Sequence, residues 1–352
     1  MKTSRRTFLF GSISILLLVV VLELMARTAL ALLGYPFWQP SKMFYPEVEV
    51  IKKQEISPTD GYFDILLLGG SAISMDFGFH INKSLDSLLN PKGTAPKVRL
   101  HNAAIPAHTS LDNLLKYQKL AEKRFDLVVF YEAINENRAN NIPPQYFRED
   151  YQHIVWYNDL ALIEKHPEVN WTVLPFVVHK SIKLITDKIN GEKNVAFKHI
   201  NPTYIMYGGE IKTAKPYRNN IEQLIKETKA RHENLLLVTY ALYVPPSVRG
   251  NGGYTDYRDF AGCQFPSPLH LWGDPVNVEK GVKQHNQTLR QLATQYEVPL
   301  MDMDSLFPRR KEFYCDLCHL TEEGSREYAH KLYEFMEQNH LLTFPSEESS
   351  VR

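Results

Sequence analysis

Most of this 352-residue chain alternates between short apolar runs and longer segments with a helical pattern. The segment Asp64–Leu68 is the clearest run, because it is apolar from its second residue onward and ends at Gly69-Gly70, as expected for a strand buried on both faces. Buried strands that alternate with helices predict a parallel sheet with helices on both faces. We therefore expect an α/β fold, a three-layer α/β/α sandwich built on a five-stranded parallel sheet. The other predicted strands are Val98–His101, Asp126–Tyr131, Leu235–Tyr240 and Val298–Met301; the predicted helices are Leu111–Arg124, Asn219–His232, Val278–Tyr296 and Glu322–Gln338, the last capped by Thr321.

The N-terminus has the pattern of a membrane segment. A short basic tip is followed by Thr7–Leu22, which contains no charged residue, and with Glu23 as the single exception the apolar stretch reaches Ala26. This length is close to that which spans a bilayer. We expect an uncleaved signal anchor, a single-pass transmembrane helix with its basic end in the cytoplasm. The chain from about residue 36 would then be extracytoplasmic, either periplasmic or extracellular.

Two other export signals remain open. Ala29-Leu30-Ala31 has the form that a signal peptidase accepts, so the segment could be a cleavable signal peptide. Ser4–Leu9 resembles a twin-arginine signal. All three alternatives export the body of the protein.

The pattern divides the chain into three parts. Residues 1–35 form the cytoplasmic tip and the anchor, and residues 36–60, which contain several prolines among polar residues, suit a linker. Residues 61–345 form the main domain. Within it, about 138–215 break the alternation and have no strong strand signal, so we expect a partly helical insertion.

Composition excludes some classes of protein. Forty basic and forty acidic residues give no net charge, so nothing favours nucleic acid as a partner. The three cysteines are too few for a disulfide scaffold but allow one bridge in an exported protein. The oligomeric state is not determined by the sequence.

Polar residues follow four of the predicted strands, where ligands bind in an open parallel sheet. Ser71 follows Gly69-Gly70, and Asn102–Ser110 and Glu132–Asn137 follow the next two strands. Asp316-Leu317-Cys318-His319 lies shortly after the fifth. These loops supply a candidate nucleophile, a hydrogen-bonding loop, a side-chain amide, and an acid with a base.

Together these segments resemble the SGNH (GDSL-type) serine esterase and hydrolase family, of the membrane-anchored bacterial type, over about residues 62–340. Gly69-Gly70-Ser71 is similar to the first block of that family and Asn102 with Ala107 to the second, with Ala in place of Gly. Ala133-Ile134-Asn135-Glu136 is similar to the third, and Asp316 with His319 to the fifth. The resemblance implies a flavodoxin-like SGNH hydrolase fold.

The roles of these residues follow from acyl-transfer chemistry. A serine hydroxyl needs a base to accept its proton, so Ser71 is the expected nucleophile and His319 the base. Asp316 would orient the imidazole and stabilise its cation, which completes a catalytic triad. The backbone N–H groups of Ser71 and Ala107 and the Asn135 amide would form the oxyanion hole. If Ala107 takes the positive φ that suits a glycine, its N–H is strained or displaced.

The segment Cys315–His319 also has other interpretations. C-x-x-C-H is a c-type haem attachment pattern, and Cys315, Cys318, His319 and Cys263 are suitable zinc ligands. In an oxidising compartment Cys263 could instead bridge to Cys315 or Cys318 and hold the 249–274 loop near the site. A direct bridge from Cys315 to Cys318 is the third possibility.

These observations predict an extracytoplasmic serine esterase that hydrolyses acyl esters of glycans, lipids or small alcohols and needs no metal or cofactor. The alternatives are an O-acyltransferase acting on cell-envelope glycan, a catalytically degenerate SGNH domain that binds glycan, and a haem or metal carrier.

Overall fold

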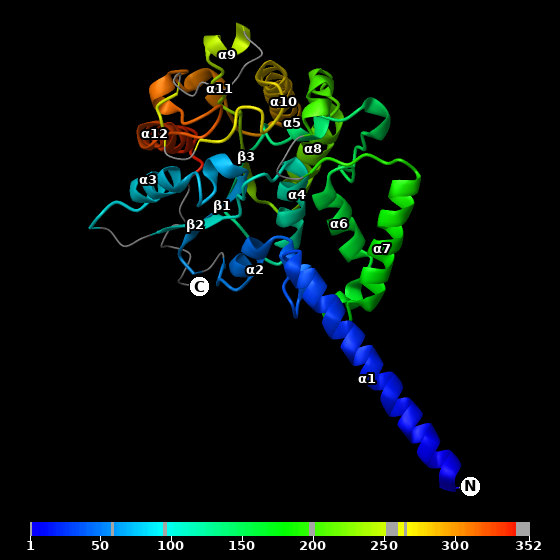
Figure 1. Ribbon diagram of the computed structural model, residues 1–352. Helices are drawn as coiled ribbons and strands as arrows, with labels where there is room; N and C mark the ends of the chain where they lie inside the picture. Colours follow the sequence, from blue (N-terminus) through cyan, green and yellow to red (C-terminus); the bar gives the residue numbers. More distant parts are fainter. Residues whose placement is uncertain are drawn as a thin grey trace. The chain divides into compact units, whose positions relative to one another are not determined.

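The computed structural model describes residues 2–57, 60–93, 97–196, 201–250, 260–263 and 266–342 (Figure 1). Some predictions fall on residues outside these ranges: Pro58 of the expected linker, part of the 249–274 loop, residues 197–200 of the expected insertion, and residues 343–345. The chain forms two compact units. We call residues 1–46 with 152–194 the helical unit and residues 47–151 with 195–352 the sheet unit.

The sheet unit is built on five parallel strands in the order β2-β1-β3-β4-β5, so the predicted five-stranded parallel sheet is confirmed. Strand β1 is buried along its whole length, as its apolar sequence predicts. The last two strands are shorter than expected: β4 ends at Val238, and β5 pairs only over two residues. The strands are β1 (Phe63–Gly69), β2 (Val98–Asn102), β3 (Leu127–Tyr131), β4 (Asn234–Val238) and β5 (Leu300–Met301).

Helices cover both faces of this sheet, as the alternating pattern predicts. Helices α3 and α12 pack against each other on one face, and α4, α8 and α10 pack side by side on the other (Figure 1). Thr321 caps α12, since its hydroxyl accepts a hydrogen bond from the Gly324 N–H. The five helices are α3 (Phe79–Leu89), α4 (Ser110–Lys119), α8 (Ala214–Ala230), α10 (Pro275–Tyr296) and α12 (Glu322–Gln338).

The shorter elements of the sheet unit lie in its loops. Helix α2 occupies part of the segment expected to be a linker and buries Val48 and Ile51. Helix α3 was not among the predicted helices, although Ile81, Leu85 and Leu89 recur at a spacing of four and are buried. The short elements are α2 (Pro46–Lys52), η2 (Ser71–Ile73), α5 (Asn137–Asn140), η3 (Pro144–Tyr146), η5 (Pro202–Gly209), α9 (Pro246–Gly250), α11 (Met303–Leu306) and η7 (Lys311–Phe313).

The helical unit contains the N-terminal helix α1 (Lys2–Leu32). Its stretch Thr7–Leu32 is long and apolar enough to cross a membrane. The rest of the unit packs around a small aromatic core. In this core the ring centroids of Phe44 and Trp156 are 4.6 Å apart, and those of Tyr35 and Phe176 are 6.0 Å apart. Its remaining elements are η1 (Pro40–Met43), α6 (Val155–Glu164), η4 (Pro167–Asn170) and α7 (Leu174–Ile189), so the interval expected to be partly helical does contain helices.

Candidate active site

Ser71 lies directly beyond the carboxyl end of β1, beside the point where the strand order reverses between β1 and β3. It is buried and opens the single turn η2, held there by Gly69-Gly70. A Cβ at Gly70 would clash with a Glu132 carboxyl oxygen and with the Asn135 amide nitrogen, so any side chain here would displace these two groups. The glycine therefore allows the loop after β3 to pack against the turn that carries Ser71.

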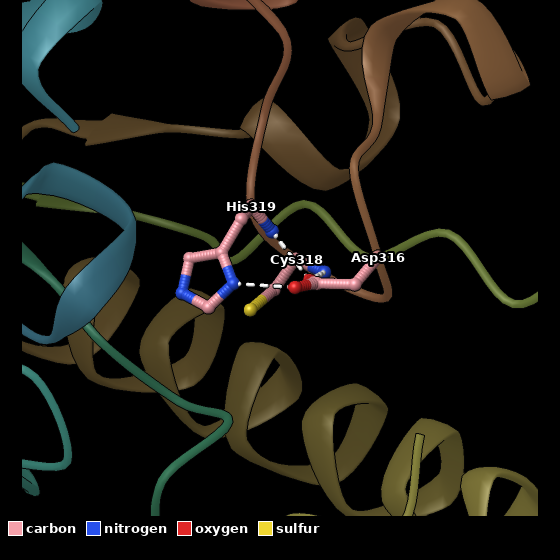
Figure 2. A group of neighbouring side chains, drawn as sticks. All are labelled: Asp316, Cys318 and His319. Carbon is pink, nitrogen blue, oxygen red and sulfur yellow. Dashed lines mark hydrogen bonds and ion pairs between the residues drawn. The ribbon is translucent and has the colours of Figure 1, made fainter. Parts of the chain in front are cut away.

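The structure brings Ser71, His319 and Asp316 together, although Ser71 is far from the other two in sequence. His319 Nε2 lies 2.7 Å from Ser71 Oγ, and its Nδ1 lies 2.7 Å from Asp316 Oδ2. Figure 2 shows the second of these contacts, with the imidazole and the carboxylate on the same turn of chain. The geometry is that of a hydroxyl, a base and an orienting acid in one hydrogen-bonded line.

The Asp316 carboxylate is fully buried but well supplied with donors. Oδ1 accepts from the backbone N–H groups of Cys318 and His319, each at 2.9 Å, and Oδ2 accepts from the Ser267 N–H at 2.7 Å. Burial alone would raise the pKa of Asp316, but the His319 charge, the hydrogen bond from its ring and the backbone N–H groups of Cys318 and His319 hold it below its usual value. The carboxylate is therefore available to stabilise an imidazolium.

Aromatic side chains enclose the imidazole. Phe77 stacks on the His319 ring with a centroid distance of 4.4 Å, and the Trp272 ring lies 6.0 Å away. Ser267 Oγ is 3.4 Å from His319 Nδ1. These contacts restrict the ring to the orientation that faces Ser71.

Asn135 lies next to the Ser71 turn, against Gly70. Its amide is fully hydrogen-bonded: Nδ2 donates to the Glu132 carboxyl at 2.9 Å and to the His108 carbonyl at 3.0 Å. Oδ1 accepts from Arg138 at 2.6 Å and from Trp272 Nε1 at 3.0 Å. Asn135 must give up one of the two Nδ2 bonds before it can donate to a substrate oxygen.

Ala107 has a φ of 75°, the left-handed conformation that suits glycine. The condition stated for Ala107 in the sequence analysis is therefore met, and its backbone is strained because a Cβ is disfavoured in this conformation. The Ala107 carbonyl accepts from Arg138 Nη2 at 2.8 Å, and the same nitrogen donates to Asn135 Oδ1. Arg138 thus joins the two loops that carry candidate oxyanion donors.

Asn102 supports the same region from behind. Its amide donates to the Ile73 carbonyl at 2.7 Å, and its Oδ1 accepts from the Ala104 N–H at 2.7 Å. Asn102 therefore connects the η2 turn to the loop after β2.

Glu132 lies beneath the site with two bonds to Asn135. Oε1 accepts from the Asn135 N–H at 2.7 Å, and Oε2 accepts from Nδ2. Burial raises the pKa of Glu132 to about 8. The two buried carboxyl groups at this site thus have pKa shifts of opposite sign.

The cysteines are paired in one of the three ways that the sequence left open. Cys263 is bonded to Cys315, and Cys318 is a buried free thiol. The haem interpretation is wrong, because Cys315 cannot form a thioether while it is in a disulfide. The four-ligand zinc interpretation is wrong for the same reason, since two of its ligands are bonded to each other.

A smaller cluster remains, in which Asp316, Cys318 and His319 offer ligand atoms within 4.8 Å of one another (Figure 2). Two of these atoms, Asp316 Oδ2 and His319 Nδ1, are already hydrogen-bonded to each other. We therefore assign the cluster to the hydrogen-bonded line that includes Ser71.

Several residues of the site have no role in the sequence-based prediction. Glu132 and Arg138 could have been suspected, since each is three residues from Asn135 in the segment that follows β3 at the sheet edge. Ser267, Trp272 and Phe77 carry no local signal. Their contacts depend on loops that meet only in the folded chain.

No protein-family model matches the chain, and no curated protein matches it. Among solved structures it is similar to a lipase/acylhydrolase from Enterococcus faecalis, with 14% identity, 79% of this chain and 96% of that chain covered, and a TM-score of 0.41. It is also similar to a GDSL-like lipase from Bacteroides thetaiotaomicron, with 11% identity, coverage of 85% and 98%, and a TM-score of 0.44. An acetyl xylan esterase, AlAXEase, matches with 14% identity, coverage of 77% and 98%, and a TM-score of 0.41.

Replacing Ala107 by glycine should stabilise the protein. The substitution relieves the strain at positive φ but adds freedom to the unfolded chain, so we expect a net gain of about 0.5–1 kcal/mol. Thermal unfolding of the purified protein measures it. As a control, Ala121→Gly at an exposed position without positive φ should not stabilise. An equal shift in both variants would contradict this explanation.

The contribution of Asp316 to stability should depend on pH. A carboxylate with a depressed folded-state pKa stabilises above its unfolded pKa, and the contribution is lost as the pH falls through the folded value. We therefore expect the difference in melting temperature between wild type and Asp316→Asn to be larger at pH 6 than at pH 3. A difference that is constant or grows towards low pH would show that the pKa is not depressed.

Breaking the disulfide should lower activity as well as stability. Cys263 is four residues from Ser267, whose N–H binds Asp316, so we expect the Cys263–Cys315 bond to hold that donor in place. We expect Cys263→Ser to cost about 2–4 kcal/mol of stability and to lower ester hydrolysis about tenfold through misplacement of the acid. Reductant should reproduce the loss in wild type and leave Cys263→Ser unchanged. Full activity in the variant would show that the bridge does not position Asp316.

Proposed function

We propose that this chain is a serine esterase of the SGNH type that hydrolyses carboxylic esters through an acyl-enzyme on Ser71. The observation that carries the proposal is the unbroken hydrogen-bonded line from Ser71 Oγ through both nitrogens of His319 to Asp316. A merely structural serine does not require a buried histidine and a charged carboxylate aligned behind it. The line lies at the edge of the sheet where open α/β folds bind their ligands.

In the first half of the reaction Ser71 Oγ attacks the ester carbonyl carbon while its proton passes to His319 Nε2. Asp316 stabilises the imidazolium that forms, since its carboxylate is held ionised by four N–H donors. The tetrahedral intermediate then expels the alcohol, which takes the proton from His319. Ser71 is left as an acyl ester.

In the second half water replaces the alcohol. His319 Nε2 accepts a proton from water as the oxygen attacks the acyl carbon, and it returns that proton to Ser71 Oγ when the acid leaves. No step requires a metal or a cofactor. If a sugar hydroxyl takes the place of water, the same steps give O-acyl transfer.

The oxyanion of each tetrahedral intermediate needs donors fixed in advance. The backbone N–H groups of Ser71 and Ala107 and the Asn135 amide are the candidates, and one such donor typically lowers the barrier by about 3 kcal/mol. For Asn135 to act, its bond to the His108 carbonyl is exchanged for one to the oxyanion, while its bond to Glu132 keeps the amide in place.

A second candidate is a degenerate domain that binds an acylated glycan without turning it over. Two observations favour it: the strained Ala107 backbone and the fully bonded Asn135 amide. Each weakens a donor that hydrolysis needs but leaves a binding surface intact.

Helix α1 and the disulfide together support a location for the site outside the cytoplasm. Helix α1 would anchor the chain in a membrane, and the Cys263–Cys315 disulfide fits an oxidising compartment outside the cytoplasm. Acylated envelope glycans, lipids and small acyl esters are the substrate classes that such a site would meet.

Ser71→Ala should lower hydrolysis of a short-chain p-nitrophenyl ester by roughly 10⁶-fold in kcat. Ser87→Ala, at an exposed position on α3, is the matched control and should keep wild-type activity. A fluorophosphonate probe should label wild type and Ser87→Ala but not Ser71→Ala. Equal rates in all three proteins would exclude the esterase. A folded wild type that neither turns over the ester nor takes up the probe would favour the binding domain.

A further inference from the structure

Helix α7 has an apolar face that no described residue of its unit covers. Val178, Ile182, Ile185 and Ile189 recur at spacings of four, three and four, which places them in one stripe along the helix. Their exposed fractions are 56%, 58%, 61% and 78%. Phe176 and Asp187 are buried on the opposite side, where α7 packs on its own unit. A folded, exported protein rarely leaves such a stripe in water.

The start of α7 is tied to α1. The Glu23 carboxylate accepts hydrogen bonds from the Val173 N–H and the Thr172 hydroxyl, both at 2.9 Å. Arg27, which is 4% exposed, binds Glu23 at 2.7 Å and donates to the Trp171 carbonyl at 3.0 Å. These bonds fix the beginning of α7 at the level of residues 23–27 of α1.

That level lies within the stretch that is apolar enough to cross a membrane. The stretch Thr7–Leu32 has 26 residues, or about 39 Å of helix, and exceeds the roughly 30 Å hydrocarbon core of a bilayer. About 20 residues counted from Thr7 fill that core and end near Ala26. Glu23 and Arg27 therefore lie at the boundary on the C-terminal side, where a neutralised, hydrogen-bonded ion pair is tolerated.

Trp171 marks the same boundary. The residue is 88% exposed although its carbonyl is held by Arg27. Tryptophan is enriched where the hydrocarbon meets the head groups, because its ring is apolar and its N–H is polar. Figure 1 shows one end of α7 beside α1 within the helical unit.

We propose that Trp171 and the α7 stripe lie in the interfacial layer of the same bilayer that α1 crosses. The occupant of the apolar face is thus lipid, and the helical unit is a two-point attachment made of a span and an interfacial helix. The continuity of the stripe with the boundary of α1 favours lipid over a second protein. The inference rests on the proposed membrane anchor and concerns no residue of the candidate active site.

The test uses the full chain in nanodiscs of phosphatidylcholine and phosphatidylglycerol, with an NBD fluorophore on a single introduced cysteine. The positions are Ile185→Cys on the stripe, Leu17→Cys within α1 and Gln295→Cys on an exposed turn of α10. Cys318 is buried and the other two native cysteines are bonded. We expect NBD at 185 to be blue-shifted and quenched severalfold more by lipids with a shallow doxyl group than by lipids with a deep one. NBD at 17 should be quenched best by the deep group, and NBD at 295 by neither.

Each other outcome overturns the inference. If 185 behaves like 295 while 17 is quenched, the anchor holds but α7 does not touch lipid. If 185 is blue-shifted but not quenched, protein covers the stripe, and a dependence on the number of chains per disc would identify a second copy. If 17 is not quenched either, the anchor itself fails.

A second measurement avoids a substitution on the stripe. Brominated lipids quench tryptophan that they contact. The quenched part, measured as the absolute emission per protein that is lost when brominated lipid replaces ordinary lipid, should therefore fall in Trp171→Phe relative to wild type. Trp272→Phe, whose ring is buried in the sheet unit, is the control and should leave the quenched part unchanged. An unchanged quenched part in Trp171→Phe would contradict contact between Trp171 and lipid.

Discussion

The buried carboxylate of Asp316 is the constraint on which the site depends. An ionised carboxylate without partners cannot be buried at an acceptable cost, so the fold must deliver donors to both of its oxygens. Two come from its own turn, as the N–H groups of Cys318 and His319, and one from the imidazole. The fourth comes from Ser267, on a loop tied to the same turn by the Cys263–Cys315 bond. The turn, the loop and the His319 imidazole are therefore held in place by one charge.

A second buried carboxyl group a short distance along the sheet edge has the opposite character. Glu132 receives its hydrogen bonds from Asn135 alone among the described residues, and burial raises its pKa to about 8. Burial is complete for both groups, so the difference lies in their surroundings: Asp316 has more N–H donors and the His319 charge beside it, whereas Glu132 has the like charge of Glu136 nearby. The fold thus lowers the pKa of the carboxyl group behind His319 and raises the pKa of the one behind Asn135.

In the helical unit, the ion pair between Glu23 and Arg27 holds several segments together in a similar way. Glu23 and Arg27 are one helical turn apart on α1, and between them they bind backbone groups at the start of α7 and the carbonyl of Phe37. Such a pair is expensive within an apolar helix unless its remaining donors and acceptors are used. The hydrogen bonds of this ion pair therefore determine where the start of α7 contacts α1. They also help to determine which face of α7 is exposed.

The features that follow from the sequence by itself are those set by neighbours along the chain. Apolar runs specify the buried strands, Gly69-Gly70 specifies the turn before Ser71, and a spacing of three lets Asp316 reach His319. Only the tertiary structure decided the rest: the pairing of Cys263 with Cys315, the donor from Ser267, the φ of Ala107, and the bonds that occupy Asn135. The disulfide, the Ser267 donor and the bond from Asn135 to the His108 carbonyl join segments that are distant in sequence, and no local pattern encodes which loops will meet. The helix α7 shows the same division, since its apolar stripe can be read from spacing, whereas its attachment to α1 depends on contacts across about 150 residues of chain.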